Sequence, residues 1–441
     1  MNGEDLYKAM NMIEDKYLEE IYIADENIDH SQKKLRGWKS AVLSAVAAFI
    51  LVFVGVVNLC PTVAIAMNDI ILLGDLAKAV TFDPSMRACL ENEYAQYVGE
   101  KQLTKDGHYS KVYYMVVDAS RISFFYKTDV LWFSEDDKSL YSTVHIEGMN
   151  GEDIGSAAAL LETGIDGLYE YQVDFIDEPI PEELRFMVCY VDPMAVKSHD
   201  VSEAVYTLYP EEQYRSVVKC YDINKDINIF GQKVHLDKLE VYPTQAKLCL
   251  KADEENSAYL QDISILLKDD RGKEYTAKTN GLTGTFNDKG NVDSKWYEST
   301  YFSKTGSITI EITAAEWIPI EKRYGSISYD KQTIENIPEG VTISEMKLNA
   351  NHSLTIEFRA PVRNNFLKVL GNVRSVETGE YCDWVSDEEG RDGYSVTIDN
   401  DDEKYQIQRL TISNFRENAY EMEWDWGIKK ELEEPVEILV K

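Results

Sequence analysis

The most apolar segment of the chain covers residues 41–60, twenty positions without a charged side chain. A bilayer core about 30 Å thick needs roughly 20 apolar residues in a helix, because each residue adds about 1.5 Å. A helix also pairs all of its own backbone polar groups, which a lipid environment demands. The pattern therefore predicts a transmembrane helix over residues 41–60.

Charged residues on either side of this segment predict its orientation. The acidic part of the chain follows the segment, and four basic residues precede it: Lys33, Lys34, Arg36 and Lys39. Basic flanks stay on the cytoplasmic side of a membrane. We therefore expect a single-pass protein of the cell membrane, with residues 1–40 in the cytoplasm and the C-terminal part outside.

Removal of the predicted span is the alternative to a retained anchor. A signal peptidase could use the small residues Ala64 and Ala66, but the forty-residue acidic leader is far longer than an ordinary signal peptide n-region. A lipoprotein anchored at Cys60 is disfavoured because the bulky Leu59 precedes it. Retention as an anchor is the prediction that fits the sequence best.

Before the span, apolar side chains recur at steps of three or four residues, the spacing of one face of an amphipathic helix. This apolar stripe consists of Leu6, Met10, Ile13, Tyr17 and Ile21. A cytoplasmic segment this short has no core of its own against which the stripe could pack. We therefore expect the stripe to bind a cytoplasmic partner, and a short helical hairpin or an unstructured leader remains the alternative.

After the span, the aliphatic residues 63–80 predict a helix that ends at Asp83-Pro84, and we assign residues 61–90 to a juxtamembrane helical segment. From about residue 108 the apolar positions alternate with a period of two, which indicates half-buried antiparallel strands. Residues 308–313 and 354–359 are the clearest examples. Beyond residue 100 helix content should be low, and residues 151–163 are the best helix candidate.

Turn signals separate these strands at short intervals, as in β-sandwich modules. Four such signals stand at residues 269–272, 287–290, 349–351 and 377–379. The predicted fold is a mainly β ectodomain of tandem antiparallel β-sandwich-like modules, preceded by a cytoplasmic helix and one transmembrane helix. The expected units are a cytoplasmic helix over 1–40, the span over 41–60, a juxtamembrane segment over 61–90, a membrane-proximal β domain over 91–222 and two modules over 223–322 and 323–441.

Charge changes the picture of possible partners. The chain has 45 basic and 78 acidic residues and a net charge of −33. Such a polyanion repels nucleic acid, because affinity for nucleic acid comes from phosphate neutralisation by Lys and Arg. We therefore expect no nucleic-acid partner, and the acidic residues are spread along the chain as a solvated surface would be.

Catalytic and metal-binding patterns are missing from the sequence. There is no Cys-x-x-Cys, His-Glu-x-x-His, phosphate loop or Gly-x-Ser-x-Gly. The alternating Asp222, Asn224, Asp226 and Asn228 resemble a calcium loop, but Ile227 replaces the required glycine. The exposed face of a strand explains them better. We predict no enzyme activity, no catalytic residue, no cofactor and no metal site.

As a whole, the chain resembles the anti-sigma-factor-like single-pass membrane proteins of Gram-positive bacteria, which carry a juxtamembrane ectodomain of unknown function. The resemblance covers about the first 320 residues. It rests on the basic stop before residue 41 and on residues 1–9, 13–20, 58–61, 94–99, 229–234 and 239–244.

The resemblance implies a cytoplasmic helix that binds an extracytoplasmic-function sigma factor and an exported part that senses the envelope or an unknown extracellular ligand. It does not extend to the zinc-dependent class of anti-sigma factors, because the chain has only His30 and no cysteine before Cys60. The alternative function is a membrane-anchored surface-binding or adhesion protein with no regulatory tail.

Overall fold

The computed structural model describes residues 71–130, 140–192, 202–279, 283–361, 370–381, 395–400, 403–424 and 427–440. The predicted span over 41–60 and the stripe residues Leu6, Met10, Ile13, Tyr17 and Ile21 lie outside these ranges. Within these ranges, no helix has both the length and the apolar character that crossing a bilayer requires.

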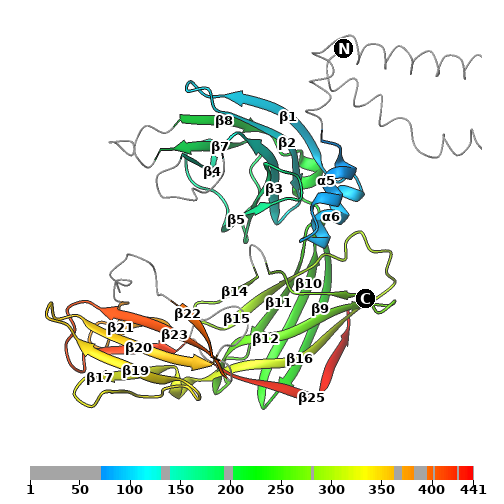
Figure 1. Ribbon diagram of the computed structural model, residues 1–441. Helices are drawn as coiled ribbons and strands as arrows, with labels where there is room; N and C mark the ends of the chain where they lie inside the picture. The colour runs from blue at the N-terminus through cyan, green and yellow to red at the C-terminus, as the bar shows by residue number, and fades with distance from the viewer. Residues whose placement is uncertain are drawn as a thin grey trace, which may run out of the picture. The chain divides into compact units, whose positions relative to one another are not determined.

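Antiparallel β-sheet dominates the described part of the chain, and its helices are few and short (Figure 1). The expectation of a mainly β fold is therefore confirmed. The helical elements are α5 (Leu73–Ala79), α6 (Pro84–Glu91), α7 (Glu212–Arg215) and the 3-10 helix η1 (Ile320–Lys322).

The first β region, residues 96–208, contains a five-stranded sheet in the order β1-β2-β3-β6-β5 and a three-stranded sheet in the order β4-β7-β8. Both sheets contribute to one apolar core, in which the rings of Phe124 and Phe186 stack with centroids 4.6 Å apart. The strands are β1 (Gln96–Leu103), β2 (Tyr109–Val117), β3 (Arg121–Thr128), β4 (Tyr141–Gly148), β5 (Ala157–Glu162), β6 (Leu168–Asp174), β7 (Leu184–Val191) and β8 (Ser202–Leu208).

The second β region combines residues 219–319 with 428–439. Its sheets have the orders β14-β15-β11-β10-β9 and β13-β12-β16-β25. Leu248, Ile310 and Ile438 are among the side chains from both sheets that form its core. The strands are β9 (Lys219–Ile229), β10 (Gln232–Val241), β11 (Ala246–Ala252), β12 (Ala258–Asp269), β13 (Glu274–Tyr275), β14 (Gly284–Phe286), β15 (Val292–Tyr297), β16 (Ile308–Pro319) and β25 (Ile428–Leu439).

The third β region, residues 324–424, has sheets in the orders β18-β17-β24-β21 and β19-β20-β23-β22. Its own core includes Phe358 and Trp424, whose rings meet edge to face at 5.9 Å. The strands are β17 (Tyr324–Ser328), β18 (Thr333–Ile334), β19 (Thr342–Leu348), β20 (Leu354–Pro361), β21 (Leu370–Ser375), β22 (Ser395–Asn400), β23 (Glu403–Ile412) and β24 (Tyr420–Trp424).

The chain order makes the third β region an insertion into the second. After β24 the chain returns, and β25 pairs with β16, so that Ile438 lies opposite Ile310. The expected module over 323–441 therefore ends in a strand whose partner belongs to the preceding region. No local sequence pattern indicates that β25 pairs with β16, because a whole folded region separates the two strands.

The sequence located several strands and turns correctly. The alternating residues 308–313 lie in β16, residues 354–359 lie in β20, and all four turn signals fall at or between strand ends. The helix expected over residues 151–163 is wrong, because this segment forms the edge strand β5, paired with β6. The helix expected to end at Asp83-Pro84 ends at Ala79, and a second helix, α6, begins at Pro84.

Candidate functional site

A buried polar junction begins at the first turn of α6. Asp83 caps this helix, since its Oδ1 accepts hydrogen bonds from the backbone N–H groups of Ser85 at 2.9 Å and Met86 at 3.1 Å. Aspartate is a favoured N-cap residue, and proline fits the first helical position because it lacks an N–H that would need a partner there. Asp83 followed by Pro84 is therefore a helix start that the sequence itself carries.

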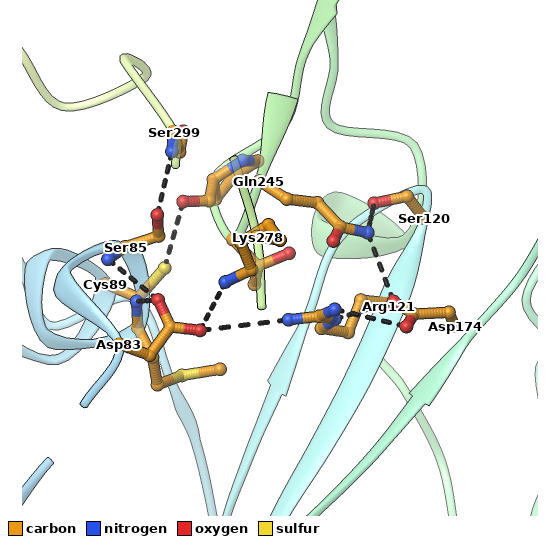
Figure 2. A network of polar contacts seen from close by, with 12 residues as sticks. Asp83, Ser85, Cys89, Ser120, Arg121, Asp174, Gln245, Lys278 and Ser299 are labelled. Carbon is orange, nitrogen blue, oxygen red and sulfur yellow. Dashed lines mark hydrogen bonds and ion pairs between the residues drawn. The ribbon is translucent and has the colours of Figure 1, made fainter. Parts of the chain in front are cut away.

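The second oxygen of Asp83 binds two cations from different β regions. Its Oδ2 accepts a hydrogen bond from the ammonium group of Lys278 and lies 3.9 Å from Nη1 of Arg121 (Figure 2). Burial opposes ionisation of Asp83, but the charges of Lys278 and Arg121 outweigh it and lower the pKa of the carboxyl. One buried carboxylate thus joins α6 to the start of β3 and to the segment after β13.

Arg121 makes a two-pronged ion pair with Asp174, its register partner on β6. Nε lies 2.7 Å from Oδ1 and Nη2 lies 3.1 Å from Oδ2, and both side chains are completely buried. Gln245 of the second β region donates from Nε2 to Oδ1 of Asp174 at 3.2 Å and to Oγ of Ser120 at 3.0 Å. Burial lowers the pKa of the guanidinium, but Asp174 more than compensates and raises it.

Asp118, in the turn between β2 and β3, provides a further link between the two regions. Its Oδ1 accepts from the backbone N–H and hydroxyl of Ser120, each at 2.9 Å, and from the backbone N–H of Arg121 at 3.1 Å. Its Oδ2 accepts from the N–H of Thr244 at 2.8 Å and from the Thr244 hydroxyl at 2.7 Å. Burial raises the pKa of Asp118, and the bonds from Thr244 oppose that rise.

Helix α6 also touches the second β region directly. Ser85 Oγ accepts a hydrogen bond from the backbone N–H of Ser299 at 2.7 Å, and the Cys89 thiol donates to the carbonyl of Pro243 at 3.3 Å. Burial and the charge of Asp118 raise the pKa of Cys89 well above its usual range. Cys89 is therefore a packed, neutral thiol and not a nucleophile.

Glu170, on β6, differs from the other carboxyl groups of the junction. It is completely buried, and in the described part of the chain no well-formed hydrogen bond reaches either of its oxygens, near which the Ser123 hydroxyl lies. Burial and the charge of Asp83 raise the pKa of Glu170 to about 7, against the opposing effects of the Ser123 hydroxyl, Arg121 and Lys278. This carboxyl can therefore change its protonation state near neutral pH.

The chemistry of the junction suits attachment and not catalysis. Arg121 and Lys278 are engaged by carboxylates and shielded from solvent, so they are poor candidates for binding a substrate from solution. No group of three or more His, Cys, Asp or Glu side chains within the described ranges is arranged to hold a metal ion. The junction fixes α6, β3 and the second β region to one another.

The sequence did not predict this junction. The partner-binding residues that it did predict, in the stripe from Leu6 to Ile21, lie outside the described residues. The Asp83-Pro84 pair is a visible signal, but from the sequence we expect only the end of one helix there and not the start of α6. The calcium-like residues were interpreted correctly: Asp222 and Asp226 lie on the exposed side of β9, whereas Ile227 and Ile229 are buried.

Comparison with known proteins adds one family match. Residues 218–356 match the model of DUF5643, a family of unknown function. This range runs from the second β region into the third and contains two of the segments, 229–234 and 239–244, that carry the resemblance noted from sequence. The match carries no information about anti-sigma factors.

A solved structure of a conserved domain protein from Bacillus anthracis is weakly similar to the chain. It shares 16% identity, the alignment covers 55% of this chain and 85% of that chain, and the TM-score is 0.35. A likeness at this level supports no conclusion about function. No curated protein matches the chain.

Proposed function

We propose that this chain is a single-pass membrane signalling protein without catalytic activity. Its β regions respond to the envelope or to an extracellular ligand, and its N-terminal helix binds an extracytoplasmic-function sigma factor. The observation that supports this proposal is the buried attachment of α6, which follows the predicted span closely in sequence, to two β regions through Asp83.

A signal that crosses a membrane through one helix needs a stiff element next to that helix. Coupling between distant sites requires packed or hydrogen-bonded groups that have two arrangements. Asp83, Arg121 and Lys278 are buried and hold one another, so a displacement of either β region would move a charge that holds the start of α6. An adhesion protein that is merely anchored has no need of this attachment.

On the cytoplasmic side, the proposal rests on the stripe from Leu6 to Ile21. A helix of this length is marginal in water without a packing partner, and partner proteins recognise such helices in apolar grooves through anchors spaced by three or four residues. The sigma factor is proposed as the partner because of the family resemblance.

The test is capture of the sigma factor by the full-length membrane protein. Ile13→Asp with Tyr17→Asp should abolish capture and raise transcription of the sigma factor's targets, because each lost anchor typically costs about 1–3 kcal/mol and an aspartate in the groove is unpaired. The control variant, Glu14→Gln with Glu19→Gln, changes neighbouring polar positions and should retain capture.

Two outcomes would reject the regulatory proposal. One is that the double aspartate variant captures the sigma factor as well as the parent does. The other is that the parent captures no sigma factor at all. In either case the membrane-anchored surface-binding or adhesion protein becomes the better account.

A further inference from the structure

The buried junction has more acidic than basic groups. It contains two cationic side chains, Arg121 and Lys278. Its four carboxyl groups are Asp83, Asp118, Glu170 and Asp174. Both cations are engaged by the other carboxylates: Arg121 by Asp174 and Asp83, and Lys278 by Asp83. Two carboxyl groups of the junction, Asp118 and Glu170, are therefore left without a cation partner among the described residues.

Glu170 is the carboxyl group with the least support. Asp83, Asp118 and Asp174 each accept hydrogen bonds from several donors. Within the described ranges Glu170 has only the Ser123 hydroxyl near it, and no well-formed hydrogen bond reaches either of its oxygens. An isolated ionised carboxylate is very costly in a low-dielectric interior, and such a group takes up a proton instead. Asp118 is stabilised by its hydrogen bonds, so a proton on Glu170 removes the one uncompensated charge that lacks such support.

The strand geometry places this proton within the attachment of α6. On β6, Glu170 and Asp174 point to the same face of the sheet, because side chains two and four positions apart share a face. Asp83 at the start of α6 acts electrostatically on Glu170, and the Cys89 thiol responds to the charge of Glu170. Ionisation of Glu170 thus adds a further negative charge that acts on Asp83, the carboxylate that holds α6.

We propose that Glu170 is a proton-controlled switch: its neutral form allows α6 to stay attached to the first and second β regions, and its ionised form weakens that attachment. The charged and titratable groups that act on it are Asp83 and Cys89 of α6, Arg121 of β3, and Lys278 of the second β region. This inference concerns regulation of the exported part and holds whether or not the N-terminal helix binds a sigma factor.

The direction of the pH effect follows from linkage. The pKa of Glu170 is raised to about 7 when α6 is attached, whereas an exposed glutamate has a pKa near 4.3. The attached state therefore binds more protons between these values, so its stabilisation is complete at low pH and is lost as pH rises through about 7. Asp83 has a lowered pKa, so its contribution to the attached state has the opposite pH dependence: it is present at higher pH and is lost only in strong acid.

The experiment measures hydrogen exchange of the α6 amides in the full-length protein in detergent, as protection factors between pH 5 and pH 8. In the parent, the α6 protection factor should fall by up to about a hundredfold over this range, because each unit of pKa difference is a factor of ten. Glu170→Gln keeps a neutral side chain of the same shape and should hold the protection high at every pH. The matched control, Glu178→Gln, removes an exposed carboxylate and should behave like the parent.

A protection factor that stays constant with pH in the parent would overturn the proposal, and so would a Glu170→Gln variant that loses protection as the parent does. Recovery of protection at pH 8 on addition of Na⁺ or Ca²⁺ would also overturn it, because a cation would then neutralise the site. If Glu170→Gln does not fold, infrared spectroscopy of the parent decides. A protonated-carboxyl band must be present at pH 6 and lost above neutral pH. Its absence at pH 6 refutes the proposed protonation switch at Glu170.

Discussion

Asp83 performs three tasks with one carboxylate: it caps α6, binds Lys278 of the second β region and faces Arg121 of the first. A surface ion pair contributes little to stability, but removing one partner of a buried pair leaves an uncompensated charge. The side chains of all three residues are at least nine-tenths buried. Asp83 is therefore the residue at which we expect the largest effect of a single substitution.

Asp83→Ala should destabilise the first and second β regions by about 3–5 kcal/mol, because it leaves Lys278 and Arg121 without this carboxylate and removes the helix cap. The measurement is the free energy of unfolding of the full-length protein in urea, with Glu91→Ala as a control on the same helix. Glu91 is exposed, and its replacement should change the value by less than about 0.5 kcal/mol. Equal effects of the two substitutions would contradict the role given to the junction.

Cysteine reactivity should separate Cys89 from Cys220. Both pKa values are raised, but Cys89 is completely buried under α6, whereas Cys220 on β9 is exposed. Because the thiolate is the reactive form and needs access to the reagent, maleimide at pH 8 should label Cys220 in the native protein and leave Cys89 unlabelled. Mass spectrometry of the labelled peptides measures this, and rapid labelling of Cys89 under native conditions would show that α6 is not attached as described.

Residue-level pairings were the least predictable from sequence. Lys278 stands 195 positions after Asp83, and Thr244 stands 126 positions after Asp118. A side-chain contact over such a separation depends on how whole regions fold, so no local spacing can indicate it. The helix cap at Asp83 depends on two adjacent residues, and for that reason a signal for it was present in the sequence.

At the scale of elements, periodicity predicted the strands well where one face is buried. The apolar side chains Ile308, Ile310 and Ile312 of β16 are all buried, as their alternation predicted. Strand β5 was missed because its sequence, AAALLE, consists of good helix formers. Pairing with β6 overrides that preference, which is a tertiary effect that propensity cannot include.

Strand β25 provides a direct test of the inserted arrangement. Ile438 is buried in the core of the second β region, whereas its neighbour Leu439 is 68% exposed. Ile438→Asp should lower the free energy of unfolding by about 3–5 kcal/mol, since it buries an unpaired charge and removes apolar contacts. Leu439→Asp makes the same chemical change on the opposite face and should cost less than about 1 kcal/mol.

The measurement for both variants is urea unfolding followed by limited proteolysis. Cleavage of the Ile438→Asp variant should begin within residues 219–319 and spare the core of the third β region, to which β25 does not contribute. Preferential cleavage within residues 324–424 would contradict the assignment of β25 to the second region.

At the scale of the whole molecule, composition and patterning predicted the fold class but not the chain's path. Alternation, turn residues and low helix content were enough to predict a mainly β protein. The insertion of one region into another was not predictable, because β16 and β25 have ordinary strand patterns and only their pairing reveals it.

The basic residues before the predicted span indicate the orientation of the chain in the membrane, and reporter fusions can test that orientation. A reporter fused after residue 100 should be active outside the cell, and the full-length protein should remain in the membrane fraction. Isolation of a mature protein beginning near Met67 would show instead that a signal peptidase removes the segment over 41–60.

Circular dichroism of residues 71–441, which retain Asp83 and α6, should show a β-rich spectrum that a chelator leaves unchanged. The basis is the extensive antiparallel sheet and the paired apolar cores of the three β regions. The expected change in melting temperature on addition of EDTA is less than about 2 °C, within the small effects of altered ionic conditions. A mainly helical spectrum, or unfolding in the chelator, would contradict this prediction.

The position of β25 also fixes the order in which the protein can fold as it is made. During synthesis β16 appears first, and its partner β25 appears only after all of the third β region has followed. At a typical rate of 5–20 residues per second, β16 waits on the order of ten seconds with one edge unpaired. Exposed strand edges recruit other chains. The third region needs no later strand, so it can fold during this interval. Once folded, it holds the end of β16 near the start of β25. Its folding therefore limits how long the nascent chain is exposed to aggregation.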